Sequence, residues 1–225
     1  MSLSEYIGKY WTGAEAIYGV IIVMTFTSVL RSNGVVFEQM HATIILAALA
    51  CCIAWGITDG LFYVWERSSI LRQENHVIRL SRSESQGESA VSLVGDELDD
   101  TILRYIPREK RLDLYRKLVQ YLSGAQEGNR MSLRDTATIV LGTSLLSLGA
   151  GLVVVVPFFL GSFPVLHLGD AEIALKVSNL LGILLLFGVG VYRAVRRDLA
   201  SKIISGFGTA LIGIIIAGIT IALGG

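Results

Sequence analysis

Five long stretches of the chain are almost free of charged side chains, and segments rich in charge separate them. A helix needs about 20 mostly apolar residues to cross the hydrocarbon core of a bilayer. Five stretches reach or approach that length, namely residues 14–30, 41–65, 136–160, 171–192 and 203–223. The pattern predicts an all-α polytopic membrane protein with five transmembrane helices.

The first residues show a different pattern, in which large apolar side chains recur every three or four positions. The polar residues Glu5 and Lys9 fall on the opposite face, and the apolar face is made of Leu3, Tyr6, Ile7, Tyr10 and Trp11. Such a pattern is typical of a short helix that lies in the membrane interface. A frayed tail is the alternative interpretation.

Residues 66–135 form the only sizeable polar segment, with twelve acidic and twelve basic residues. This segment predicts a helical cytosolic insert between spans two and three, so we divide the chain into residues 1–65, 66–135 and 136–225. The absence of Gly and Pro from residues 66–79 predicts that span two continues beyond the membrane. A second helix is expected from near Asp96 to Tyr105, and Pro107 is suited to open a third.

Two apolar or small-residue faces predict contacts with neighbours. The third helix of the insert has a stripe of Leu112, Tyr115, Val119 and Leu122, which needs a partner from the other insert helices or from a second subunit. On span five, a face of small residues permits close helix packing and consists of Gly206, Ala210, Gly213 and Ala217. These faces predict a homodimer.

The basic residues are distributed unevenly between the loops. Twelve of the nineteen Lys and Arg lie in residues 67–134, and four more lie in residues 193–202. The other two loops have only Arg31 and Lys176. Because basic loops face the cytoplasm, we expect a cytoplasmic N-terminus and a C-terminus outside or in a lumen, in the cell membrane if the source is prokaryotic.

The composition agrees with a membrane protein and limits the kinds of molecule that the chain is expected to bind. The mean hydropathy is +0.60 and 17% of residues are charged, against about 25% in soluble domains. The chain carries equal numbers of acidic and basic residues, which disfavours nucleic acid as a partner. We find no catalytic motif or cofactor-attachment motif, so neither an enzyme nor a tightly bound cofactor is expected.

The candidate chemistry lies in the acidic residues of the first two spans. Asp59 is six residues inside the end of span two, or roughly 9 Å at 1.5 Å per residue, and Glu15 enters span one from the same side. Ionisable groups at membrane depth are costly and call for a functional hypothesis. The two carboxylates are expected to share a proton or a cation such as Mn²⁺ or Fe²⁺. Structural alternatives are a hydrogen bond from Asp59 to another helix and an interfacial charge at Glu15.

Three further residues are candidates for the same metal. Met24 offers a soft thioether, which would favour iron over magnesium. Glu66 lies seven residues after Asp59 on the same helix face, and Glu74 continues that face towards the insert. The alternative for Glu66 is a solvated surface carboxylate.

The chain resembles the vacuolar iron transporter family in its N-in topology, five spans and charged helical insert. Tyr18-Gly19 and the following apolar-Thr-Phe run are similar to the span-one motif of that family, with Glu15 one turn before the position of the family's acid. Residues 54–67, with Asp59 followed by Glu66, are similar to its second span, and Trp55 stands at the position of a family Met. Residues 208–224 are similar to the last span.

The resemblance implies a dimeric transporter that exchanges Fe²⁺ or Mn²⁺ for protons. We therefore expect a membrane transporter of divalent cations, by proton-coupled antiport, with Glu15, Met24, Asp59, Glu66 and Glu74 as metal-site residues. The alternative is a non-transporting membrane scaffold or sensor of the same fold.

Overall fold

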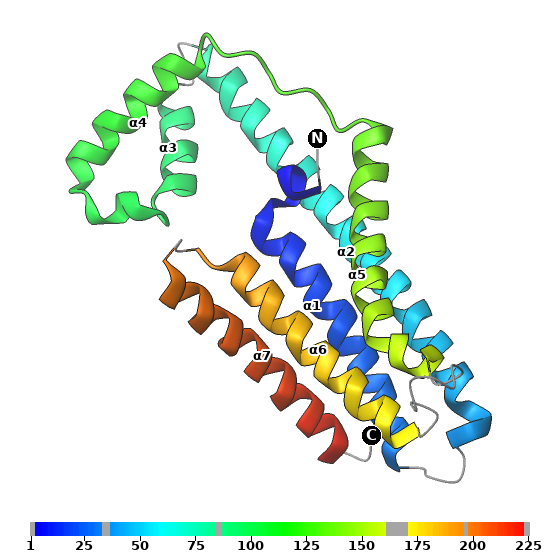
Figure 1. Ribbon diagram of the computed structural model, residues 1–225. Coiled ribbons are helices and arrows are strands. Elements are labelled where there is room, and N and C mark those ends of the chain that lie inside the picture. Colours follow the sequence, from blue (N-terminus) through cyan, green and yellow to red (C-terminus); the bar gives the residue numbers. More distant parts are fainter. Residues whose placement is uncertain (1–2, 33–36, 84–86, 161–170, 196–197, 223–225) are drawn as a thin grey trace. The chain divides into compact units, whose positions relative to one another are not determined.

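The computed structural model describes residues 3–32, 37–83, 87–160, 171–195 and 198–222 of the chain. Every regular element of these residues is helical (Figure 1). The chain forms two compact units. Unit 1 comprises Met1–Tyr63 and Leu133–Gly225, and unit 2 comprises Val64–Ser132.

Five long helices contribute to unit 1. They are α1 (Leu3–Ser32), the first part of α2 (Phe37–Ser81), α5 (Leu133–Leu160), α6 (Ala171–Arg193) and α7 (Leu199–Ala222). Among the described residues, four helices are long and apolar enough to cross a membrane, namely α2, α5, α6 and α7. By length and composition the chain is therefore an integral, multi-pass membrane protein of helical class.

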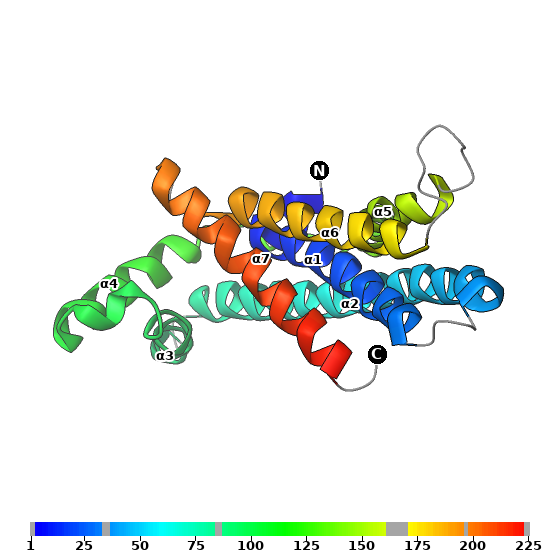
Figure 2. The same ribbon diagram turned by 60° about the horizontal axis from the view of Figure 1, so that its bottom comes forward.

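The first predicted span is not among these four candidates. It belongs to α1, whose N-terminal half carries Glu5, Lys9 and Glu15. These charges lower the mean hydropathy of the described part of the helix. Nevertheless, α1 packs against α5, α6 and α7, and it lies in the middle of unit 1 (Figures 1 and 2).

Helix α1 is interrupted at Gly8, which has φ of 80° and ψ of 156°. Glycine adopts this backbone conformation without the steric cost that other residues meet. The turn before the kink is held on α5, where the Tyr6 hydroxyl donates a 2.5 Å hydrogen bond to Asp135 Oδ1 and Leu3 packs on Gly142. The sequence pattern thus marked a separate N-terminal segment, and its place at a membrane interface stays a prediction.

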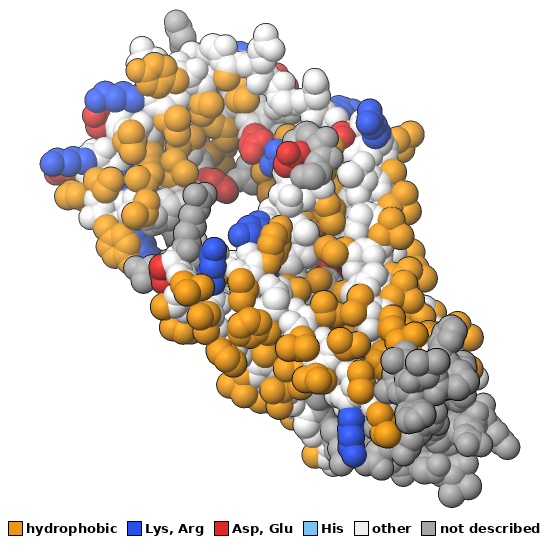
Figure 3. Space-filling view, viewed as in Figure 1, with side chains coloured by type: hydrophobic (Ala, Val, Ile, Leu, Met, Phe, Trp, Pro, Cys, Tyr) orange, Lys and Arg blue, Asp and Glu red, His pale blue; other side chains and the backbone are white. Residues whose placement is uncertain are grey.

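The outer surface of unit 1 is apolar along α7. Figure 3 shows hydrophobic side chains over this helix, and its exposed residues include Ile204, Phe207, Leu211, Ile212 and Ile215. On its other face, Gly206 lies against Phe187 and Val191 of α6. An apolar outer face and a close-packed inner face are expected of a helix between lipid and protein.

Unit 2 is built around its own small core. Helices α3 (Gly87–Leu98) and α4 (Arg108–Leu122) flank the 3-10 turn η2 (Ile102–Tyr105). Buried side chains of both helices meet Val77 of α2, and the set comprises Ala90, Val91, Val94, Tyr115 and Val119. The Tyr115 hydroxyl donates a 2.6 Å hydrogen bond to Asp99 Oδ1, and this bond raises the pKa of Tyr115.

The prediction for the second helix of the insert was wrong. We expected it to begin near Asp96, but α3 ends at Leu98 and only the short turn η2 follows. Acidic residues such as Asp96, Glu97, Asp99 and Asp100 favour the first turn of a helix because of the helix dipole. Instead Asp99 follows the helix and forms a 2.6 Å ion pair with Arg111. The third helix does follow Pro107, and α2 does continue beyond the apolar stretch to Ser81.

Both faces that predicted a homodimer are occupied within the chain. The stripe of α4 packs against α3, so the first of its two expected partners is the one observed. Gly213 packs against Leu186 of α6, as Gly206 packs against other α6 residues. The homodimer stays a prediction, but these two sequence features no longer argue for it.

We expect Gly190→Ala to destabilise the α6–α7 contact. A methyl group at Gly190 would lie 2.5 Å from the Ser205 backbone oxygen and 2.8 Å from Gly206 Cα. Overpacking of this kind costs about 1–3 kcal/mol, measurable by thermal unfolding in detergent. Gly208→Ala is the matched control, because nothing lies within 4 Å of its methyl group and Ala favours a helix over Gly by about 1 kcal/mol. Equal melting temperatures for the two variants would contradict this packing.

Candidate functional site

Among the described acidic residues of unit 1, Glu15 is the most deeply buried. Its side chain is 0% exposed, among the helices that surround α1. The Tyr63 hydroxyl donates a 2.9 Å hydrogen bond to Glu15 Oε1. The second oxygen, Oε2, is also buried, and no N–H or hydroxyl group of the described residues donates a hydrogen bond to it. Glu15 therefore has one oxygen atom that accepts from a hydroxyl group and one that does not, in a region closed to solvent.

The second predicted acid, Asp59, lies beside Glu15. The two carboxyl groups are close enough to interact directly, and the Trp55 side chain also lies next to Asp59. Asp59 is half-buried. Among the described residues, neither carboxyl group has a Lys or Arg partner. The structure thus brings together the two acids at the centre of the sequence-based prediction.

Aromatic rings from α1 and α2 surround this carboxylate pair. The Tyr63 ring lies 6.0 Å from the Trp11 ring, and the Trp55 ring lies 6.2 Å from the Tyr18 ring. In both contacts, one ring belongs to α1 and the other to α2. Tyr and Trp rings of this kind combine an apolar body with a polar atom that can donate a hydrogen bond.

Close packing between α2 and α5 fixes the position of Asp59. A methyl group on Gly56 would lie 2.5 Å from Ser144 Cα, and one on Gly60 would lie 2.7 Å from Val140 Cα. The Thr143 hydroxyl donates a 2.7 Å hydrogen bond to the Gly56 carbonyl oxygen. Gly56 precedes Asp59 and Gly60 follows it, and both pack against α5. The backbone that carries Asp59 therefore lies close to α5 before and after this residue.

Two adjacent carboxyl groups without a cationic partner have a limited set of stable states. If both are ionised, like charges in a low dielectric repel strongly. A proton shared between them removes one charge, and a bound cation can remove both. The unsatisfied Glu15 Oε2 is the atom that either would engage. The geometry can therefore bind a proton or a cation reversibly.

Met24 does not join this pair. It lies nine residues after Glu15 on α1, or roughly 13 Å along the helix axis. The side chain is 2% exposed and belongs to the apolar core of unit 1, where its sulfur packs on Gly182 of α6. The structure thus places Met24 in the apolar core and does not bring it together with Glu15.

Glu66 and Glu74 are residues of unit 2, and both are exposed. Glu74 Oε1 lies 3.8 Å from Arg67 Nη1 in an exposed ion pair. Such pairs contribute little to stability and stay accessible to water. Within the described ranges, no three His, Cys, Asp or Glu residues form a group that could hold a metal ion.

Tyr63 is the site residue that the sequence analysis missed. It follows Asp59 by four residues and so lies one turn further along the same helix face. That spacing was a usable signal, because a phenol one turn from an intramembrane acid is placed to share its hydrogen-bond partner. Trp55 lies one turn before Asp59 and was noted only for its place in the family comparison.

Among the described residues, the all-helical fold with four apolar helices long enough to cross a membrane defines a polytopic membrane protein. No protein-family model, curated protein or solved structure matches the chain.

We expect Tyr63→Phe to destabilise unit 1, because it leaves Glu15 Oε1 buried without a donor. An unsatisfied buried acceptor costs about 1–3 kcal/mol, which thermal unfolding in detergent at neutral pH will detect. Tyr121→Phe is the matched control, because this tyrosine is 80% exposed and its loss should be neutral. A melting temperature unchanged by Tyr63→Phe would show that the Tyr63–Glu15 bond does not form in the native protein.

Proposed function

We propose that this chain is a cation transporter of the membrane in which Glu15 and Asp59 bind a divalent cation and protons alternately. The observation that carries the proposal is the buried carboxyl group of Glu15, which lies beside Asp59 in a pair without a basic partner among the described residues. A charge at membrane depth costs about 2.5–3.5 kcal/mol on insertion scales. Binding a proton or a cation removes that cost.

The chemistry of the pair favours a hard cation as the transported species. Two carboxyl groups and the Tyr63 phenol offer oxygen atoms only, and oxygen ligands suit Mn²⁺ better than soft metals. With Met24 in the apolar core, the argument for Fe²⁺ loses its thioether. Mn²⁺ is therefore the preferred substrate, and Fe²⁺ is the second.

Proton coupling follows from competition for the same oxygen atoms. A cation binds the deprotonated pair and releases protons, so metal affinity falls as the pH falls. A pH gradient then drives cation movement in the opposite direction to the protons. This is the antiport that the family resemblance also implies.

The proposal includes five crossings, with α1 as the first, and a cytoplasmic N-terminus. The central position of α1 in unit 1 supports the fifth crossing, and the distribution of basic residues supports the orientation. On this topology, unit 2 is cytosolic and the C-terminus is on the opposite side.

A second candidate function is that of a membrane sensor or scaffold without transport. It is favoured by the lack of a third acidic, His or Cys ligand near the pair among the described residues. In that case the pair holds a proton only, and unit 2 acts as a docking surface.

The topology is tested by fusing a reporter to either end. A fluorescent protein that folds only in the cytoplasm should be bright at the N-terminus and dark at the C-terminus, while a periplasmic phosphatase shows the opposite. Bright fluorescence at both ends would mean an even number of crossings and would remove α1 or another helix from the set of spans.

The transport proposal is tested by measuring Mn²⁺ flux into liposomes when a pH gradient is imposed across their membrane. Asp59→Asn keeps size and hydrogen bonding but removes the exchangeable charge, so gradient-driven flux should fall at least tenfold. Glu15→Gln should behave alike. Asp113→Asn is the matched control, because Asp113 is exposed in unit 2 and pairs with Lys117 at 2.7 Å.

Equal flux in wild type, Asp59→Asn and Glu15→Gln would exclude the pair from transport. Absence of Mn²⁺ and Fe²⁺ flux in the wild-type protein would favour the sensor or scaffold.

A further inference from the structure

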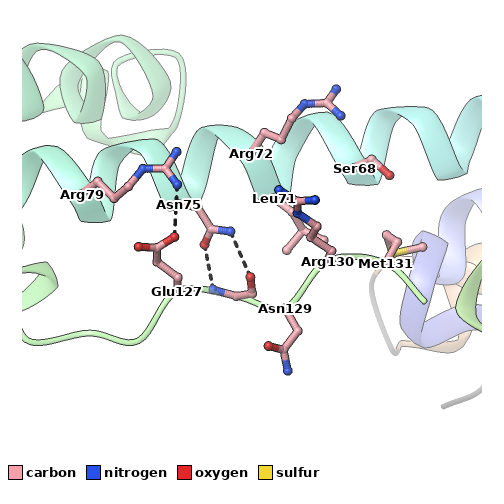
Figure 4. Close-up of a pocket in the computed structure, with 10 residues that line it drawn as sticks. Ser68, Leu71, Arg72, Asn75, Arg79, Glu127, Asn129, Arg130 and Met131 are labelled. Carbon is pink, nitrogen blue, oxygen red and sulfur yellow. Dashed lines mark hydrogen bonds and ion pairs between the residues drawn. The ribbon is translucent and has the colours of Figure 1, made fainter.

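A cavity of about 840 Å³ lies within unit 2, between the C-terminal part of α2 and the segment of residues 125–131 that leads to α5. Its lining is made of Ser68, Leu71, Arg72, Asn75, Arg79, Glu127, Gly128, Asn129, Arg130 and Met131 (Figure 4). Small-molecule sites in proteins typically measure about 300–1,000 Å³. The cavity is independent of the Glu15–Asp59 pair.

The two walls of the cavity are fixed to each other by specific hydrogen bonds. The Asn75 side-chain amide donates to the Gly128 carbonyl oxygen at 2.9 Å, and the Gly128 N–H donates to Asn75 Oδ1 at 2.7 Å (Figure 4). Arg82 adds a 2.6 Å bond to the Ala125 carbonyl oxygen. These hydrogen bonds therefore hold the segment of residues 125–131 against α2 and define the shape of the cavity.

The charge of the lining is strongly unbalanced. It contains three arginines, Arg72, Arg79 and Arg130, and one acid, Glu127, so three positive charges minus one negative charge leave two positive charges. Glu127 is already bound by Arg79 at 3.2 Å and by Arg82, from outside the lining, at 3.6 Å. The unbalanced charge thus resides on Arg72 and Arg130.

Neither of these two arginines has an acidic partner among the described residues. Arg72 makes one 3.3 Å hydrogen bond to the Ser69 hydroxyl, and Arg130 approaches α2 from the opposite wall, beside Leu71 (Figure 4). The chain as a whole is neutral, so this local excess of two charges is a specific feature. Ser68 lies one turn before Arg72 on α2, whereas the Asn129 side chain points away from α2 (Figure 4).

We propose that this cavity binds a phosphate monoester group. A phosphate monoester carries about 1.5 to 2 negative charges at neutral pH, which matches the two unpaired guanidinium groups. The planar fork of arginine presents paired N–H donors to phosphate oxygens. The phosphate belongs either to a soluble phosphate ester or to the headgroup of an anionic lipid such as phosphatidic acid.

The test uses the full-length protein in an uncharged detergent. Equilibrium dialysis with radiolabelled glycerol 3-phosphate measures the soluble source, and native mass spectrometry after addition of phosphatidic acid measures the lipid source. Phosphatidylcholine is the lipid control, because it has the same glycerol backbone without a free monoester. Binding of either phosphate monoester, weakened at high salt by screening, is the expected result.

Substitutions of Arg72 and Arg130 test whether these two arginines bind the phosphate. Arg72→Gln with Arg130→Gln should weaken binding at least tenfold. The Lys replacements at both positions should weaken it less, because they keep the charge but lose the fork. Two checks of folding apply to all of these variants, namely the size-exclusion profile and the helical content. Both should match the wild type, because the side chains of Arg72 and Arg130 are exposed.

Arg108→Gln is the matched charge control, since Arg108 is an exposed arginine at the start of α4 outside the cavity lining. It should bind as the wild type does. The proposal is overturned if neither phosphate monoester binds, if phosphatidylcholine binds as well as phosphatidic acid, or if the double Gln variant binds like Arg108→Gln.

Discussion

The burial of one carboxyl group at the meeting of α1 and α2 is the constraint on which this account depends. Glu15 is closed off from solvent on the central helix of unit 1, and no basic residue among those described compensates it. Burial of a charged group without compensation is far more costly than burial of an apolar one. The surrounding helices must therefore supply a hydrogen bond, a proton or a cation.

The neighbours of Glu15 are arranged to meet this requirement only in part. Tyr63 satisfies one oxygen atom, and Asp59 adds a second acid rather than a counter-charge. Gly56 and Gly60 allow α2 to lie close to α5 while Asp59 and Tyr63 face α1. A purely structural buried acid is expected to be fully paired, and the incomplete pairing of Glu15 and Asp59 is the reason for the proposal that they exchange a proton for a cation.

Sequence patterns predicted the helical membrane class because a long apolar segment in lipid must satisfy its own backbone hydrogen bonds, and a helix does so. The same simple depth argument predicted that Glu15 and Asp59 would meet, since both enter from one side on neighbouring antiparallel spans. It did not predict that Met24 packs in the apolar core, because depth along a helix does not tell which neighbours a side chain meets. Tyr63 was missed because a tyrosine near a helix end is usually read as an interfacial anchor.

The insert shows a different limit of prediction from sequence. The apolar stripe of α4 was visible, but its partner depended on where α3 begins, and the acidic residues near Asp96 resembled a helix start more than a helix end. Asp99 is stabilised there by Arg111 and Tyr115, residues more than ten positions away. Compensation by tertiary contacts of this kind leaves no periodic signal in the sequence.

The most direct measurement of the central claim is infrared difference spectroscopy of the purified protein, with and without Mn²⁺ at neutral pH. The account predicts a protonated carboxyl band that disappears when Mn²⁺ is added to the wild-type protein and that Mn²⁺ no longer removes in Glu15→Gln or Asp59→Asn. A band that Mn²⁺ still removes in these variants, or a wild-type spectrum that Mn²⁺ does not change, would contradict the claim that the pair exchanges a proton for a cation.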